Sequence, residues 1–401
     1  MQLIKREFAT KIFHKRSLKM LAQRMKNLKP YVPGEQPKDR EYIKINANEN
    51  PYPPSPEVGK AVKALIDGNL KKLGLYPDPD SSELHAAIAD MLNKTGGVLS
   101  RCHVNGKEVT PDPKDKLPFT VTPDMIYTGN GSDEVLSFVF YAFFDSDRPL
   151  ICPEHSYSFY PVYCGFYDIP RLPVALNSDW TLDVKKMTEL SNKTNSSTIF
   201  ANPNAPTSLG MTRDEIKKML DESPKDRVFV VDEAYVDFDG ESVIGLLKDY
   251  KNLVVVRTFS KSLCGAGMRS GYIVANPELV NAVTTVKNSL NHFPMDAVTQ
   301  VAATAACRDV AYYVECAKKV CDTRADFISY LKKNGYTVND SKTNFVFLKK
   351  DGLDGKKAYE FIKQNGILVR RFDTPGIEEY LRITIGTQDQ MNKLKEIMDR
   401  L

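Results

Sequence analysis

The sequence predicts an α/β protein in which a mostly parallel sheet lies between helices and a smaller α+β unit follows. Over about 150 residues, apolar runs typical of buried strands alternate with helical patterns. This alternation is typical of parallel strands joined by helical crossovers. The 401 residues are enough for roughly two or three domains of ordinary size and a large core.

The elements of the large sheet are predicted in chain order. A helix at 55–67, capped by Ser55, and one from 81 or 82 to 93 come first. Strands are expected at 125–128, 150–152, 173–175, 198–201, 228–231 and 253–256, with helices near 132–144, 161–166 and 213–220. A long helical pattern covers 295–334. The smaller unit follows, with strands near 337, 345–348, 368–370 and 381–385 and helices at 356–365 and 388–400.

This pattern predicts four parts along the chain. They are a basic extension (1–25), an arm and helix that belong with the smaller unit (26–70), the large unit (71–295), and a linking helix with the smaller unit (296–401). Residues 96–122 form a polar, proline-rich insertion in the large unit, and Asn105-Gly106 inside it favours a hairpin at the surface.

Composition excludes several classes of protein. An apolar content of 42% and a charged content of 26% are ordinary for a soluble globular chain. The net charge of +4 is too small to predict nucleic-acid binding, and no apolar run approaches the roughly 18 residues of a membrane span. The seven cysteines form no Cys-x-x-Cys pair, so neither disulfides nor a metal site is predicted. We expect a cytoplasmic protein without a nucleic-acid or membrane partner.

The first 25 residues differ from the rest in composition, because they contain seven basic side chains and one acidic side chain, Glu7. A targeting segment has this composition. An untethered extension, or a start codon placed too early with Met20 and Met25 following, explains it equally well.

The stretch 258–271 carries the first candidate for chemistry. Ser260 and Lys261 lie just beyond the strand at 253–256, and Arg269 follows eight residues later. Ligands of open α/β sheets bind beyond the carboxyl ends of strands. A lysine there can attack a carbonyl with its amine, and an arginine can grip a phosphate with two N–H groups. A solvated pair in a surface loop is the plainer interpretation of this stretch alone.

A second candidate lies between the strand at 125–128 and the helix after it. The backbone N–H groups of Gly131, Ser132 and Asp133 begin that helix, where the helix dipole and free N–H groups favour an anion. The motif is neither a P-loop nor a dinucleotide fingerprint. An ordinary helix cap would also explain it.

Polar residues also follow the strands at 198–201 and 228–231. Asn202 begins a proline-rich turn, and Asp232 is an acid at the end of a buried strand, where it needs a partner. Tyr235 follows three residues later and can present its phenol to the same ligand. A turn, a capping acid and a packed tyrosine are the alternatives.

Four strand ends thus offer an anion site, an amide, an acid with a phenol, and a lysine with an arginine. Pyridoxal 5'-phosphate needs all of them, and the acid matters because it keeps the ring nitrogen protonated, which makes the ring an electron sink. We expect the phosphate to contact residues 131–133 and Arg269, and the ring nitrogen to contact Asp232. The ring oxygen should contact Asn202 and Tyr235, and the aldehyde should react with Lys261.

From about residue 29 onward, the chain resembles the fold type I aminotransferases. The resemblance depends on four motifs and their order: Gly-Asn-Gly-Ser-Asp, Asn-Pro-Asn-Ala-Pro-Thr, Asp-Glu-Ala-Tyr, and Ser-Lys with its arginine. The stretches 30–34, 48–52, 157–163 and 380–387 make the chain look most like the histidinol-phosphate aminotransferase branch. That resemblance implies transfer of the amino group of histidinol phosphate to 2-oxoglutarate, giving imidazole acetol phosphate and glutamate in histidine biosynthesis.

The resemblance also implies roles for residues outside these motifs. Tyr157 would stack on the cofactor ring, and Ser260 would belong to the cofactor site. Tyr76 would reach the cofactor phosphate of a neighbouring subunit, so the active unit would be a homodimer. The substrate site implied by the resemblance consists of Tyr31, which closes over it, Asn50, Arg370 and Arg382, which binds the anionic end.

The sequence departs from that family at the insertion, at the basic extension, at His155 and at Leu263-Cys264. Three alternatives therefore stay open. The first two are an aromatic aminotransferase and a phosphothreonine decarboxylase of the same fold. The third is a regulator that senses the cofactor, for which a basic extension of 25 residues is too short to form a DNA-binding unit.

Overall fold

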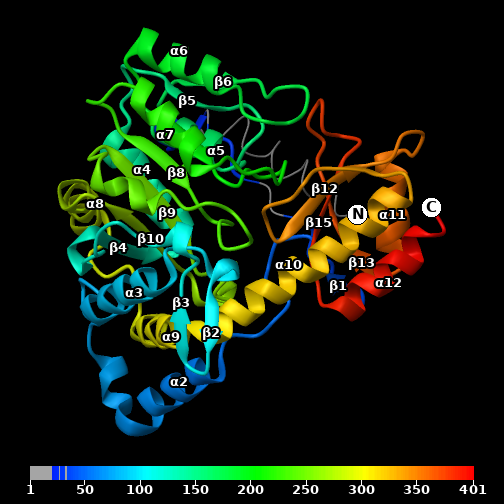
Figure 1. The fold of residues 1–401 in the computed structure, drawn as a ribbon. Coiled ribbons are helices and arrows are strands. Elements are labelled where there is room, and N and C mark those ends of the chain that lie inside the picture. Colours follow the sequence, from blue (N-terminus) through cyan, green and yellow to red (C-terminus); the bar gives the residue numbers. More distant parts are fainter. Residues whose placement is uncertain (1–19, 27, 32–33) are drawn as a thin grey trace.

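The computed structural model describes residues 20–26, 28–31 and 34–401, and it shows two bodies joined by a long helix (Figure 1). The predicted α/β fold is confirmed, because the larger body is a seven-stranded sheet covered by helices on both faces. Most of the basic extension, residues 1–19, lies outside the described residues.

The seven-stranded sheet is mixed. β10 runs antiparallel to both neighbours, whereas the strands from β9 to β6 are parallel to one another. The strand order is β4 (Ile126–Asn130), β10 (Ser270–Ala275), β9 (Leu253–Thr258), β8 (Phe229–Asp232), β7 (Thr198–Ala201), β5 (Leu150–Pro153) and β6 (Arg171–Val174).

Alternate residues of these strands pack into two apolar layers, as the period of two along a strand requires. Val230 and Val254 lie in the layer that contains α4 (Gly131–Phe143), α5 (Tyr160–Phe166) and α8 (Pro277–Leu290). Val231 and Val255 lie in the other layer, with α3 (Ser82–Thr95), α6 (Val184–Thr194), α7 (Arg213–Glu222) and α9 (Ala297–Arg308). Burial on both faces explains why these strands are continuous apolar runs.

The smaller body contains a four-stranded antiparallel sheet, and α10 (Val310–Lys333) runs to it from the larger body (Figure 1). Its strand order is β11 (Thr337–Val338), β12 (Phe345–Lys349), β15 (Leu381–Thr384) and β14 (Arg370–Arg371). The helices of this body are α11 (Gly355–Gln364) and α12 (Gln388–Met398).

The N-terminal arm divides between the two bodies. β1 (Ile43–Lys44) pairs in parallel with β13 (Ile367–Leu368) of the smaller body. The next helix, α2 (Pro56–Asn69), packs instead on α9. Short 3-10 turns complete the described chain: η1 (Gln23–Lys26), η2 (Leu70–Gly74), η3 (Leu99–Arg101), η4 (Pro113–Asp115), η5 (Pro123–Met125), η6 (Ile244–Lys248) and η7 (Ala266–Met268).

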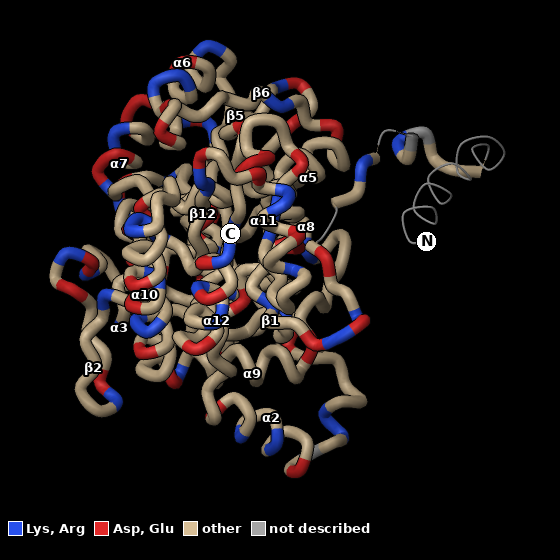
Figure 2. The backbone as a smooth tube through the Cα atoms, turned by 90° about the vertical axis from the view of Figure 1, so that its right-hand side faces the viewer, with Lys and Arg blue, Asp and Glu red and all other residues tan. Residues whose placement is uncertain are grey.

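The hairpin expected at Asn105-Gly106 is confirmed. β2 (His103–Asn105) and β3 (Glu108–Thr110) pair across a turn in which Gly106 has a φ of +63°, and the hairpin projects from the body (Figure 2). The insertion is anchored by Asp115, which is buried and paired with Arg101 at 2.6 Å and Arg213 at 2.9 Å.

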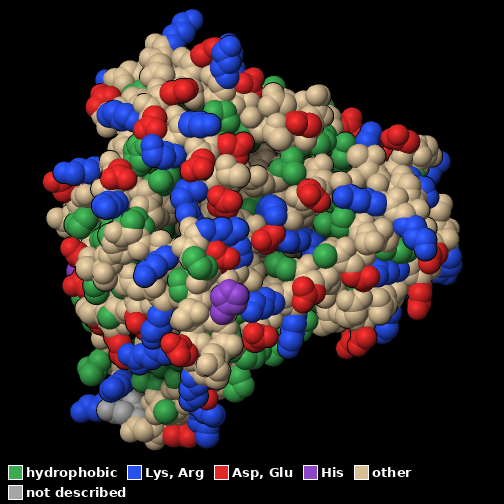
Figure 3. Space-filling view, viewed as in Figure 1, with side chains coloured by type: hydrophobic (Ala, Val, Ile, Leu, Met, Phe, Trp, Pro, Cys, Tyr) green, Lys and Arg blue, Asp and Glu red, His purple; other side chains and the backbone are tan. Residues whose placement is uncertain are grey.

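All seven cysteines are free thiols. Within the described ranges, no helix has both the length and the apolar content needed to cross a membrane. On the face seen in Figure 3, basic and acidic side chains are interspersed, and neither sign covers a large area alone.

Candidate active site

Two cavities meet at the carboxyl ends of the central strands. The smaller, of about 260 Å³, contains Ala201 of β7, Asp232 of β8, Thr258 of β9 and the start of α4. The larger, of about 410 Å³, extends toward β14 and β15 of the smaller body. Both are lined by Ala47, Tyr157, Ala205, Tyr235 and Lys261, so they form one continuous site.

Lys261 lies where the two cavities meet, three residues after the end of β9. Its Nζ donates a hydrogen bond to the carbonyl of Ala47 at 3.3 Å and lies 5.7 Å from the ring centroid of Tyr235. The Nδ2 of Asn50 donates to the Lys261 carbonyl at 2.9 Å. The N-terminal arm therefore holds both the lysine side chain and its backbone.

Asp232 is an acid buried at the end of β8, with 4% of its surface exposed. It accepts hydrogen bonds from the hydroxyl of Tyr160 at 3.0 Å and from the N–H of Ala234 at 3.1 Å. Burial raises the pKa of Asp232 to about 6. Among the described residues no cation pairs with it, so the site suits a ligand with a positive charge at this point.

Tyr160 is a site residue that the sequence did not reveal. It belongs to the aromatic run 157–163, in which no spacing distinguishes the tyrosine that reaches the acid. Burial raises its pKa, and the charge of Asp232 adds to the effect, so the side chain remains a phenol that can donate.

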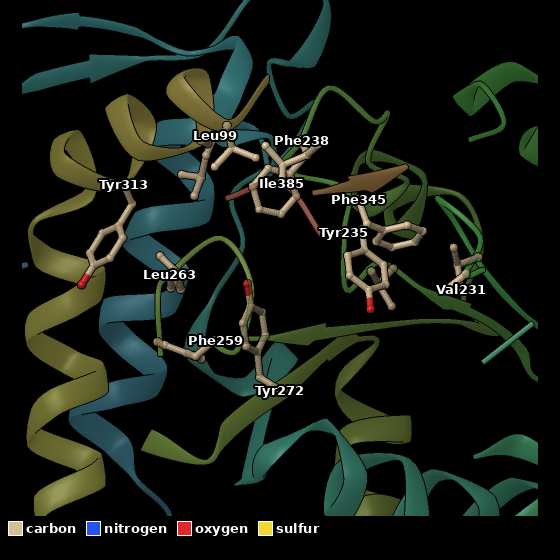
Figure 4. Close-up of a cluster of buried hydrophobic side chains, with 14 of the residues drawn as sticks. Leu99, Val231, Tyr235, Phe238, Phe259, Leu263, Tyr272, Tyr313, Phe345 and Ile385 are labelled. Carbon is tan, nitrogen blue, oxygen red and sulfur yellow. The ribbon is translucent and has the colours of Figure 1, made fainter. Parts of the chain in front are cut away.

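Tyr235 is held from two sides. The Nδ2 of Asn48 donates to its hydroxyl at 2.9 Å, and its ring contacts Phe345 of β12 edge-on at 5.1 Å (Figure 4). Because the hydroxyl accepts from Asn48, its own hydrogen is available to a ligand oxygen. Asn48 was also missed, since it lies 187 residues away in the sequence.

The start of α4 forms the candidate anion site. Gly131 has a φ of +75°, and Arg269 lies beside it, paired with Asp133 at 3.1 Å and within 3.5 Å of the Ser260 hydroxyl. A Cβ on Gly271 would lie 2.5 Å from the backbone nitrogen of Ser132, so β10 approaches the helix start as closely as a glycine permits.

Tyr157 connects the acid and anion ends of the site. Its hydroxyl donates to Asp133 at 2.8 Å, and its ring meets that of Tyr160 edge-on at 5.5 Å. Burial, followed by the charge of Asp133, raises the pKa of Tyr157 well above its ordinary value. Tyr157 lines both cavities, and its stacking on a cofactor ring stays a prediction.

The structure does not bring every predicted residue to the cavities. Asn202 uses its amide to hydrogen-bond the backbone of Met211, at 2.7 and 3.2 Å, which leaves one N–H of its Nδ2 for a ligand. Tyr76 is 81% exposed and stacks on Phe293 at 4.4 Å, away from the site of its own chain. Four predicted residues line neither cavity: Asn50, Tyr76, Gly131 and Asn202.

Two arginines form the far wall of the larger cavity. Arg370 of β14 and Arg382 of β15 are cross-strand partners. The Arg382 guanidinium lies 5.3 Å from the Phe345 ring and 5.5 Å from Phe372, and it forms no ion pair within the described chain. Burial lowers its pKa, and the charge of Arg370 lowers it further.

Tyr31 lines this end of the cavity as well. It is 37% exposed and packs against Phe159 at 5.0 Å. The Arg382 guanidinium, which has no ion pair within the described chain, lies close to this aromatic, partly open wall and suits an anionic substrate.

The fold and the site residues together define an aminotransferase of fold type I. The model of the family "Aminotransferase class I and II" matches residues 40–400. The histidinol-phosphate aminotransferase of Syntrophus aciditrophicus is 43% identical over 95% of this chain and 98% of that protein. That of Chromohalobacter salexigens is 40% identical, over 94% and 97%. The chain therefore belongs to the class I and II aminotransferase family, in its histidinol-phosphate aminotransferase branch.

Solved structures show the same fold at lower identity. Histidinol-phosphate aminotransferase from Sinorhizobium meliloti, in complex with pyridoxal-5'-phosphate, has a TM-score of 0.74 at 23% identity and covers 90% of this chain and 92% of that chain. Aspartate aminotransferase from Thermus thermophilus, with maleate, has a TM-score of 0.75 at 17% identity, over 95% and 99%.

Proposed function

We propose that this protein is a cytoplasmic, pyridoxal-phosphate-dependent aminotransferase that interconverts L-histidinol phosphate plus 2-oxoglutarate and imidazole acetol phosphate plus glutamate. The observation that carries the proposal is that Lys261 and Asp232, 29 positions apart, line one cavity of about 260 Å³. Curated relatives of that name at 40–43% identity support the choice of substrate. Seven free thiols suit a reducing cytoplasm.

The residues of the smaller cavity fit pyridoxal phosphate chemically. Asp232 is a buried acid without a cationic partner in the described chain, which suits a protonated ring nitrogen. The start of α4 and Arg269 suit a phosphate, and the Tyr235 hydroxyl suits the ring oxygen. Lys261 supplies the amine that an aldehyde requires.

When bound, the cofactor supplies a ring that accepts the electron pair left when the donor carbon loses its proton. Asp232 maintains the proton on the ring nitrogen, and its desolvated carboxylate is stabilised by that charge. Lys261 would take the proton from the donor carbon and pass it on to the bound cofactor in the first half of the reaction, and in the second half it would deliver a proton to the carbon of 2-oxoglutarate that becomes the amino-bearing carbon of glutamate. Tyr157 excludes water from one side of the site.

Arg382 and Arg370 would bind the anionic end of each substrate in turn. The amino donor brings a phosphate and 2-oxoglutarate brings carboxylates, and a planar guanidinium pairs with either group. Tyr31 and Asn50 would close and brace this end, since Tyr31 lines the cavity and Asn50 holds the Lys261 backbone.

The active unit that we propose is a homodimer in which Tyr76 enters the site of the neighbouring chain. Its side chain is 81% exposed and stacks on Phe293 at 4.4 Å, so a large aromatic surface faces outward from its own chain. Leu70, Leu73 and Leu75, just before it, are exposed as well. Exposed apolar side chains in one segment are typical of a protein interface.

A visible spectrum tests the proposal. The purified protein should be yellow, Lys261→Ala should lose that absorbance, and the surface control Lys94→Ala should retain it. Adding histidinol phosphate should shift the spectrum, and 2-oxoglutarate should then yield glutamate. An unchanged spectrum with histidinol phosphate would contradict the substrate. Release of carbon dioxide or turnover of phenylalanine would assign the decarboxylase or the aromatic enzyme instead.

A further inference from the structure

His155 lines the larger cavity, but it has no role in the reaction proposed above. It follows β5 and lines the same cavity as Arg370 and Arg382. Its backbone carbonyl accepts a hydrogen bond from Asn204 at 3.0 Å, which fixes the main chain. Within the described chain, neither ring nitrogen has a hydrogen-bond partner. The ring contact is with Trp180, edge-on at 6.1 Å. The imidazole thus lies beside Trp180, and neither of its nitrogens is used by another residue that the structure describes.

Trp180 connects His155 to the arginines through the smaller sheet. Its indole N–H donates to the Tyr380 hydroxyl at 3.1 Å, and its ring meets that of Phe347 edge-on at 5.6 Å. Phe347 pairs with Arg382 across β12 and β15, and Arg382 pairs with Arg370 across β15 and β14. Directly paired residues present their side chains on the same face of a sheet. His155 therefore approaches, across one indole ring, the face that carries both arginines.

The segment between β14 and β15 passes over His155. A Cβ on Gly376 would lie 3.8 Å from His155 Nε2, and Gly376 has a φ of +88°, which favours glycine. Phe372, Thr374 and Ile377 of this segment line the cavity. One loop thus connects the strands of the two arginines and also closes the cavity above the imidazole.

The two kinds of anion that this cavity must accept differ in what they require. A carboxylate has two oxygens and one charge, which two guanidinium groups match well. A phosphate monoester has three terminal oxygens and carries close to two charges near neutral pH. Its third oxygen needs a further donor, and an imidazole has at least one N–H in either protonation state.

We infer that His155 donates a hydrogen bond to the phosphate of the amino donor, and so gives the cavity a preference for a phosphate ester over a carboxylate. This inference rests on the proposed function for the identity of the donor. It makes His155 a specificity-determining residue, and Trp180 the residue that positions it.

Steady-state kinetics of the holoenzyme test the inference. His155→Ala should raise KM for histidinol phosphate about tenfold, as the loss of one hydrogen bond to a charged group implies, with kcat retained. KM for 2-oxoglutarate and glutamate should stay within about twofold. His155→Gln, which retains an N–H donor, should recover much of the loss, and His103→Ala on the exposed hairpin is the control. An equal rise for all substrates, or none for histidinol phosphate, would overturn the inference.

A binding measurement separates this inference from the proposed function. Trp180 is the only tryptophan of the chain, so its emission reports on the imidazole beside it. In the holoenzyme, inorganic phosphate should change this emission at about tenfold higher concentration in His155→Ala than in wild type, whereas malonate should act alike on both. If phosphate and malonate behave in this way but the enzyme does not turn over histidinol phosphate, the proposed function is wrong and the inference about His155 stands. Equal phosphate affinities in wild type and His155→Ala would contradict the inference.

Discussion

At the scale of single residues, burial of Asp232 makes the stability of the cofactor-free protein depend on pH. Its pKa rises from 3.8 to about 6 through burial, so between these values the folded protein holds a proton that the unfolded chain has lost. Stability should therefore fall as the pH rises through this window, by roughly 3 kcal/mol for a shift of about two units.

Asp232→Asn removes the ionisable group and retains an acceptor for Tyr160. We expect this variant, without cofactor, to be more stable than wild type at pH 7.5 and equal to it near pH 4, as measured by urea unfolding. With cofactor the order should reverse, because the pair with the ring nitrogen is lost. A variant that is less stable at every pH would mean that Tyr160 and Ala234 already satisfy the carboxylate.

Arg382 is the residue on which substrate binding should depend most. Its guanidinium is desolvated between two aromatic rings, and its Nε has no partner among the described residues. Arg382→Ala should raise KM for both substrates at least tenfold, since each loses a charge-assisted contact. Arg382→Lys keeps the positive charge but loses the planar guanidinium that can donate two hydrogen bonds. Its KM values should lie between those of the wild type and those of Arg382→Ala. Unchanged KM values in both variants would move the anion site elsewhere.

Polar side chains that follow apolar strands could be selected as candidates from the sequence. Lys261 and Asp232 are of this kind, and the structure places both in the lining of one cavity, while their chemical roles stay predictions. Tyr160 and Asn48 could not be found in this way, because their partners are remote in sequence and only the tertiary fold brings them together. The roles predicted for Asn202 and Tyr76 stay predictions.

At the scale of elements, the close contact between β10 and α4 sets the anion site. A Cβ on Gly271 would lie 2.5 Å from the Ser132 nitrogen, whereas a Cβ on Gly267, four residues earlier in η7, would meet nothing within 4 Å. Gly271→Ala should push the helix start away and weaken cofactor binding at least tenfold, measured by titrating the visible absorbance. Gly267→Ala should bind as wild type does. Equal affinities in the two variants would show that the helix start tolerates the displacement.

β10 also shows where sequence patterns failed. Its apolar part, Tyr272–Ala275, is short and follows a turn rich in glycine, so the turn signal masked the strand. α6 and α8 were missed too, although Pro277 after Asn276 is an ordinary helix start. The other strands of the large sheet were found because burial on both faces makes them continuous apolar runs.

At the scale of the whole molecule, the site depends on chain segments that come from both bodies. The larger body supplies the lysine and the acid, the smaller body supplies the arginines, and the arm at 46–50 contacts both through Lys261 and Arg382. Trp180 and Tyr235 make further contacts across the boundary. No periodicity in the sequence encodes this arrangement, since it follows from how α10 places the smaller sheet (Figure 1).

The dimer can be tested through the two substitutions Lys261→Ala and Tyr76→Ala placed on different chains. If Tyr76 serves the neighbouring site, a mixed dimer has one complete site, because the chain that keeps Lys261 receives Tyr76 from its partner. Mixed dimers isolated with two tags should then show about half of the wild-type activity, far above either parent.

The matched control carries both substitutions on one chain and pairs it with wild type. In that dimer the one intact lysine receives no tyrosine from its partner, so activity should be about half of that of the Tyr76→Ala homodimer, which has two such sites. The two mixed dimers have the same composition and differ only in which chain holds which substitution, so folding defects affect them equally. If the control dimer were the active one, Tyr76 would serve its own chain, and its exposed stack on Phe293 would need another explanation.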